Sequence, residues 1–130
     1  MDLTLNQEKL DYIVRHALIE DIGRGDITTQ LTIPKNKIIK AEIQVKENCI
    51  VCGMQIAEKV FKTTDNTIKF DALVKDGNAI KSGKTIARIS GNAASILSSE
   101  RVTLNLLSML SGIATTTREY VKQIEPYRPR

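Results

Sequence analysis

The chain contains no tryptophan, and its few aromatic residues make up only 4% of the 130 residues. Any hydrophobic core must therefore be built mainly from Ile, Leu, Val and Ala. Hydrophobic residues still amount to 42% and charged residues to 26%, close to the average for soluble globular domains. This composition argues against a disordered chain, and the length predicts one domain.

Long apolar runs are also lacking, and no segment approaches the roughly 20 residues of a membrane-spanning helix. The first ten residues contain acids and amides but no apolar stretch, which argues against a signal peptide. We therefore expect a cytoplasmic protein without a membrane partner. The net charge is +4, but the basic residues are spread along the chain rather than clustered. We therefore expect no nucleic-acid partner.

Only two cysteines are present, Cys49 and Cys52, with a spacing that is typical of redox and metal motifs. A structural zinc site needs about four ligands, and the single histidine, His16, lies in a different predicted element. The pair also lies in a strand-like run rather than at the start of a helix. We therefore interpret the cysteines as buried residues at a strand end, and His16 as a partly buried packing residue.

Hydrophobic periodicity predicts an α+β domain. Period-two alternation predicts strands over Ile38–Val45, Thr67–Val74 and Thr85–Ile89, the last closed by Gly91. Helical spacing predicts three helices. The first contains Leu10–Leu18, with Thr4 or Asn6 as its cap and Gly23 as its end; the second covers Gly53–Lys62; and the third covers Ala93–Ile124, with Ser111-Gly112 as the place for a kink.

A polar segment from Glu20 to Thr29 contains three acids and two glycines. The acids could hold a metal ion or a phosphate with Mg²⁺, or they could cap backbone donors and pair with Arg24. We favour the second interpretation, because Asx and Thr side chains beside glycine commonly bond to the local backbone.

The third predicted helix is apolar around its whole circumference. Leu97 and Leu104 share one side of a helical wheel, whereas Val102, Leu106 and Ile113 lie nearly opposite. A helix that is apolar on all sides is buried on all sides, and a domain of this size covers only one of them. We therefore expect a further domain or a second subunit to cover the other side.

Arg101 is the residue of this helix that best fits a binding role. It lies near Leu97, Leu104 and Ser108 on the wheel, with Asn105 slightly further round. Its planar guanidinium matches a carboxylate or a phosphate, but an internal salt bridge explains the pattern equally well. We expect Lys81, Lys84 and Arg88 to be solvated charges of strand faces or turns.

The segment Val74–Ile89 resembles half of a lipoyl or biotin carrier domain, with the same rhythm of turns and strands. A carrier needs a modifiable lysine at a hairpin tip, and no such hairpin is recognisable here. The resemblance therefore indicates a shared barrel-sandwich geometry without carrier activity.

Three ordered motifs resemble one enzyme family. They are Ala17-Leu18-x-Glu20-Asp21-x-Gly23-x-Gly25-Asp26-x-Thr28-Thr29; Gly53 followed by Asp76-Gly77, Gly83, Ile86-Ala87 and Gly91; and Ile96-Leu97-x-x-Glu100-Arg101-Val102-x-Leu104-Asn105, continued by Leu110-Ser111-Gly112-Ile113-Ala114-Thr115-x-Thr117. On these motifs the chain resembles the N-terminal part of quinolinate phosphoribosyltransferase, also called nicotinate-nucleotide pyrophosphorylase. A transport-associated relative of the same architecture is the nearest alternative.

The resemblance implies an N-terminal α/β sandwich followed by a C-terminal α/β barrel. Residues 1–111 would form the N-terminal domain, a barrel-sandwich-like antiparallel sheet with helices, and residues 112–130 would lead into a barrel that this chain lacks. The terminal Pro126–Arg130 run, without a closing element, fits the first part of a longer protein. The family is dimeric or higher, with each N-terminal domain lying over the barrel mouth of its partner.

The implied reaction joins quinolinate and phosphoribosyl pyrophosphate to give nicotinate mononucleotide, pyrophosphate and CO₂, in NAD biosynthesis. The resemblance implies that Arg101 reaches across the subunit interface to a quinolinate carboxylate, and that Mg²⁺ accompanies phosphoribosyl pyrophosphate. The family's Thr-Arg-Lys-Thr and His-Arg segments and its acidic metal ligands are not found before Arg130. We therefore expect the chain alone to be inactive, and to supply the substrate-capping and dimerisation domain. The alternative is a stand-alone interaction module.

Overall fold

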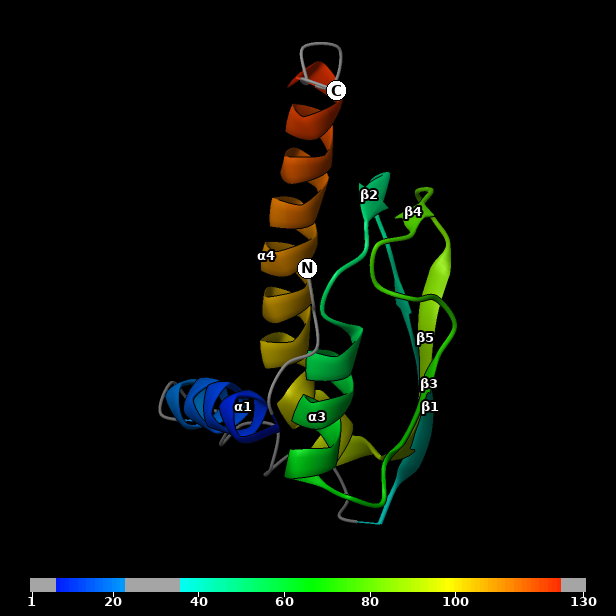
Figure 1. Ribbon diagram of the computed structural model, residues 1–130. Coiled ribbons are helices and arrows are strands. Elements are labelled where there is room, and N and C mark those ends of the chain that lie inside the picture. The colour runs from blue at the N-terminus through cyan, green and yellow to red at the C-terminus, as the bar shows by residue number, and fades with distance from the viewer. Residues whose placement is uncertain (1–6, 23–35, 125–130) are drawn as a thin grey trace.

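The structure, a computed structural model, describes residues 7–22 and 36–124. The elements in chain order are α1 (Gln7–Ile22), β1 (Ile38–Gln44), β2 (Cys49–Ile50), α3 (Met54–Thr64), β3 (Lys69–Ala72), β4 (Ala79–Ile80), β5 (Thr85–Asn92) and α4 (Ala93–Ile124). Figure 1 shows the strands on one side of α3 and α4, and α1 on the other side. The predicted α+β class is confirmed.

The strands form two antiparallel sheets. The larger has the order β1-β5-β3, and the smaller pairs β2 with β4. In the larger sheet β5 continues to Asn92, opposite Ile38, so the prediction that Gly91 closes the strand is wrong. Gly91 has φ +153°, and a Cβ there would lie 3.2 Å from Cα of Ile68. Glycine at this position therefore lets two backbone segments approach within the sheet.

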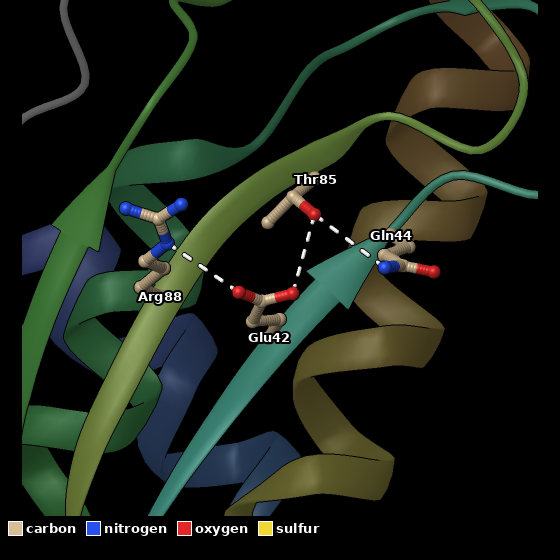
Figure 2. Close-up of polar contacts among 4 residues, drawn as sticks. All are labelled: Glu42, Gln44, Thr85 and Arg88. Atoms are coloured by element: carbon tan, nitrogen blue, oxygen red, sulfur yellow. Dashed lines mark hydrogen bonds and ion pairs between the residues drawn. The ribbon is translucent and has the colours of Figure 1, made fainter.

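The predicted alternation of β1 is confirmed, with Ile43 buried while Lys40, Glu42 and Gln44 are exposed. Figure 2 shows the outer face, where Arg88 Nε and Thr85 Oγ1 both donate to the Glu42 carboxylate at 3.4 Å. Gln44 Nε2 donates to Thr85 Oγ1 at 3.5 Å. These contacts are exposed, so they contribute little to stability. They confirm that Arg88 is a solvated residue of the sheet face, and Lys81 and Lys84 are exposed as predicted.

Strand β3 is shorter than the predicted Thr67–Val74. Before it, the Asp65 carboxylate accepts hydrogen bonds from the backbone N–H and the hydroxyl of Thr67, at 3.0 and 2.6 Å. This local turn removes Thr67 from the strand. Ala72, at the end of β3, is exposed, although the alternation over Thr67–Val74 groups it with the apolar Ile68 and Phe70.

Helix α3 is covered on both sides by apolar residues. One cluster joins Phe61 and its neighbours to the sheet and α4. The other joins α3 to α1 and α4, and contains Leu10, Val14, Ile56, Val60 and Val102. The predicted apolar side of α3 is therefore confirmed.

Helix α1 directs Leu10 and Val14 into the second cluster, and its opposite side faces outward. His16 is exposed, so the prediction that it is partly buried is wrong. It lies on the same side as Ile13, which is itself 40% exposed, and its ring contacts that of Tyr12 with centroids 4.2 Å apart. The predicted caps Thr4 and Asn6, the stop at Gly23 and the acidic segment through Thr29 lie outside the described residues.

Helix α4 is continuous from Ala93 to Ile124 (Figure 1), so no break occurs at Ser111-Gly112. Glycine lowers helix propensity but keeps its backbone N–H, so it need not interrupt the hydrogen-bond ladder. Apolar residues occupy both sides of the helix, as predicted. The exposed ones are Leu97, Leu104, Met109, Ile113, Tyr120 and Ile124. What covers them stays a prediction.

Thr103 is an exception within the buried side of α4. Its side chain is completely buried, and its hydroxyl has no hydrogen-bond partner among the described residues. Burying an unpaired hydroxyl costs about 1–3 kcal/mol. Thr103→Val keeps the shape and removes the hydroxyl, so we expect the free energy of unfolding to rise by about 1–3 kcal/mol.

Chemical denaturation of the purified chain measures this change. Ser99→Ala is the matched control, because the Ser99 hydroxyl is equally buried but donates to Ser95 O at 2.8 Å. We expect no gain from Ser99→Ala. A Thr103→Val variant that is no more stable than the parent would show that the hydroxyl is satisfied in solution.

Candidate functional site: the outer face of α4

The outer face of α4 carries the predicted binding residue. Arg101 is exposed, whereas the next two residues, Val102 and Thr103, are buried. Because these neighbours fix the rotation of the helix, Arg101 is directed away from the core. Exposure places its side chain at the surface of the described part of the domain rather than in the core.

The residues that were predicted to surround Arg101 share this exposed face. Leu97 and Leu104, each 39% exposed, lie one turn before and one turn after it. Asn105 and Ser108 are also exposed. The face therefore combines a guanidinium, two neutral polar groups and two apolar side chains, a set that suits a planar anion.

The start of α4 is fixed by a side-chain cap. The Asn92 carboxamide oxygen accepts a hydrogen bond from the backbone N–H of Ser95 at 3.1 Å, the usual arrangement at a helix N-terminus. Ala93 N–H donates to Lys37 O at 2.7 Å, which ties the helix to the residue before β1. The first turns of α4 are therefore held by the last residue of β5 and by the residue before β1. These contacts also fix the position of Arg101.

The later turns of α4 are held by a polar seam that sequence reasoning missed. Ile50 N–H donates to Thr115 Oγ1 at 2.9 Å, and Cys52 N–H donates to Ser111 Oγ at 3.0 Å. Arg118 donates to Gly77 O at 3.2 Å. The hydroxyls of α4 thus accept hydrogen bonds from backbone N–H groups, in β2 and just after it, that do not pair with β4. The spacing Ser111, Thr115, Arg118, which follows one side of a helix, was the available signal.

The N-terminus of α3 is capped from a distant turn. One carboxylate oxygen of Asp76 accepts the backbone N–H groups of Gly53 and Met54, at 3.1 and 3.0 Å. A carboxylate at this end of a helix is favoured by the unpaired N–H groups and by the helix dipole. The predicted turn at Asp76-Gly77 is confirmed, with Gly77 at φ +91°. Asp76 therefore has a structural role.

The two cysteines lie on and just after β2, and both thiols are free. Burial, together with the negative charge of Glu47, raises the pKa of Cys49 above its ordinary value. Burial and Asp76 raise the pKa of Cys52 in the same way. A raised pKa keeps a thiol protonated near neutral pH, which disfavours a reactive thiolate. The shifts favour an unreactive pair, but both side chains are half-buried rather than buried as predicted.

We expect mild oxidation to leave Cys49 and Cys52 unlinked within one chain. The backbone from Cys49 to Val51 is paired with residues 78–80, and three extended residues span roughly 10 Å. A disulfide needs Cα atoms within about 7 Å. Mass spectrometry of the chain after treatment with oxidised glutathione measures this. An intramolecular Cys49–Cys52 disulfide in the folded chain would contradict the described geometry.

Among residues 7–22 and 36–124, no group of three or more His, Cys, Asp or Glu side chains is placed to hold a metal ion. No helix there combines the length and the hydropathy needed to cross a bilayer.

Comparison with known proteins identifies the domain. The family model described as "Quinolinate phosphoribosyl transferase, N-terminal domain" matches residues 26–111. Among curated proteins, the probable nicotinate-nucleotide pyrophosphorylase [carboxylating] of Synechocystis is 39% identical over 93% of this chain and 41% of its own length. That of Bacillus subtilis is 40% identical over 93% of this chain and 42% of its own length.

Solved structures agree with this match. The nicotinate-nucleotide pyrophosphorylase from Francisella tularensis is 35% identical, with a TM-score of 0.87 over 95% of this chain and 43% of that one. NadC from Streptococcus pyogenes is 31% identical, with a TM-score of 0.89 over 95% of this chain and 44% of that one. The chain thus spans about four tenths of the length of these relatives. The chain belongs to the quinolinate phosphoribosyltransferase family, and it corresponds to the family's N-terminal domain.

Proposed function

We propose that the complete gene product containing this chain transfers a phosphoribosyl group from phosphoribosyl pyrophosphate to the ring nitrogen of quinolinate. The products are nicotinate mononucleotide, pyrophosphate and CO₂, and the reaction serves NAD biosynthesis in the cytoplasm. The observation that carries the proposal is the 39–40% identity over 93% of the chain to proteins named for this activity. This identity favours the enzyme over a stand-alone interaction module.

Within that enzyme, this domain caps the substrate site. Arg101 is exposed on the outer face of α4 in the described part of the domain. Its guanidinium can bind a carboxylate of quinolinate through two parallel hydrogen bonds. The exposed apolar side chains of α4 support a second subunit packing on this face. In that arrangement the site is completed across the interface of a homodimer or higher oligomer.

This domain supplies recognition rather than catalysis. We assign no catalytic residue and no metal ligand to it; residues 7–22 and 36–124 hold no group of three or more side chains placed for a metal ion. Mg²⁺ would accompany phosphoribosyl pyrophosphate and neutralise charge on the pyrophosphate as it leaves. The remaining cations for the carboxylates and the pyrophosphate must come from outside residues 7–22 and 36–124.

The activity is tested by incubating the complete gene product with quinolinate, phosphoribosyl pyrophosphate and Mg²⁺. We expect nicotinate mononucleotide and CO₂ in equal amounts, and no product when nicotinate, which lacks the departing carboxylate, replaces quinolinate. Failure to form nicotinate mononucleotide under these conditions would reject the proposed function.

The 130-residue chain alone is expected to show no heat of binding when it is titrated with quinolinate, with or without phosphoribosyl pyrophosphate and Mg²⁺. The reason is that Arg101 is one exposed arm of a site, and an exposed ion pair is worth only about 0–1 kcal/mol. Isothermal titration calorimetry makes this measurement. Clear binding that disappears in Arg101→Ala would show that this domain holds most of the pocket, contrary to the capping role.

A further inference from the structure

Asn105 lies one helical turn beyond Arg101 on the outer face of α4, and both residues are exposed. Residues four apart on a helix are neighbours, with Cβ atoms about 6 Å apart. The Asn105 carboxamide makes no hydrogen bond with any residue of the described ranges. Its donor and acceptor groups are therefore available to a molecule outside this domain.

Several other polar residues of α4 serve the fold instead. Ser99 donates to Ser95 O, and Ser111 and Thr115 bond to the backbone of β2 and the residues after it. Each of these serves the fold on the inner side of α4. Asparagine is a weaker helix former than alanine, and here no local hydrogen bond offsets that weakness. The described residues thus give no local reason for an asparagine at position 105, as they give none for the exposed amide of Gln123, and the two positions differ in that only Asn105 lies beside Arg101.

The surroundings of Asn105 favour an anion. Its neighbours three and four residues away are Arg101, Val102, Ser108 and Met109, none of which is acidic. A neutral carboxamide beside a guanidinium can donate to a second carboxylate without adding charge. Leu104, the exposed chain neighbour of Asn105, offers an apolar surface for the edge or face of an aromatic ring.

We propose that Asn105 is a specificity-determining residue for the acceptor, and that it donates from Nδ2 to the second carboxylate of a planar aromatic dicarboxylate while Arg101 holds the first. This inference rests on the proposed function. The two side chains can contact one molecule, because they lie one helical turn apart on the same face of α4.

The test uses Asn105→Ala and Asn105→Asp in the complete gene product. Loss of a hydrogen bond to a charged group is worth a factor of roughly 10–100, so we expect Asn105→Ala to raise the KM for quinolinate by that factor. Asn105→Asp should raise it further, because a carboxylate would repel the ligand. The KM for phosphoribosyl pyrophosphate and the melting temperature should stay unchanged. Gln123→Ala, which removes another exposed amide of α4, is the control and should change neither KM.

The outcomes separate this inference from the function beneath it. If Arg101→Ala raises the KM for quinolinate and neither Asn105 variant does, Asn105 is not a recognition residue but the proposed function stands. If no product forms even with the parent protein, the function itself is rejected. If Asn105→Asp raises the KM values for quinolinate and for phosphoribosyl pyrophosphate equally, or lowers the melting temperature, Asn105 is structural. Either result overturns the inference.

Discussion

Replacing Arg101 by alanine in the complete gene product should raise the KM for quinolinate by about 30-fold or more. Truncating one partner of a buried, hydrogen-bonded charge pair costs about 2–5 kcal/mol, and each 1.4 kcal/mol is a factor of ten. The effect should fall on quinolinate, because the fork of Arg101 is matched to a carboxylate. The KM for phosphoribosyl pyrophosphate should change much less.

Steady-state kinetics with each substrate varied in turn measures this split. Arg101→Lys keeps the charge but loses the bidentate geometry, so it should restore only part of the affinity. Arg88→Ala is the matched control, since Arg88 is an exposed arginine on the sheet face that pairs with Glu42. If Arg101→Ala leaves the KM for quinolinate unchanged while the enzyme remains active, Arg101 is not part of the acceptor site.

Gly53→Ala should lower the free energy of unfolding by about 1–3 kcal/mol from backbone strain alone. Gly53 precedes α3 at φ +107°, a conformation that residues with a Cβ rarely adopt. A Cβ there would also lie 2.9 Å from Leu110 Cδ1 in α4, so the Leu110 side chain would have to move. The substitution therefore disturbs the cap of α3 and the contact between α3 and α4 together.

Gly112→Ala tests the same chemical change in the opposite setting. Gly112 lies within α4, has no left-handed φ, and a Cβ there would contact nothing within 4 Å. Alanine is the better helix former by roughly 0.5–1 kcal/mol, so this variant should be more stable than the parent chain. Urea denaturation of both variants measures the two changes. A Gly53→Ala variant as stable as the parent would contradict the geometry before α3.

The sequence alone was sufficient for most of the helices and strands, because burial of one face imposes a local period that can be read directly. The alternation in β1 and the apolar side of α3 are examples. It also placed Arg101 on one side of a helix with Leu97, Leu104 and Asn105, since a helix fixes which neighbours share a face. The family was also identifiable from the sequence, because its three motifs occur in the same order along this chain.

Only the tertiary structure decided which contacts join residues far apart in the chain. Helical spacing put His16 beside Ile13 but could not show that this side of α1 faces outward. The cap of α3 by Asp76, the seam from Ser111 and Thr115 to β2, and the unpaired hydroxyl of Thr103 all depend on how separate elements pack. A local pattern records the period of burial, whereas hydrogen-bond partners and the direction of each face are set by neighbours that the pattern does not contain.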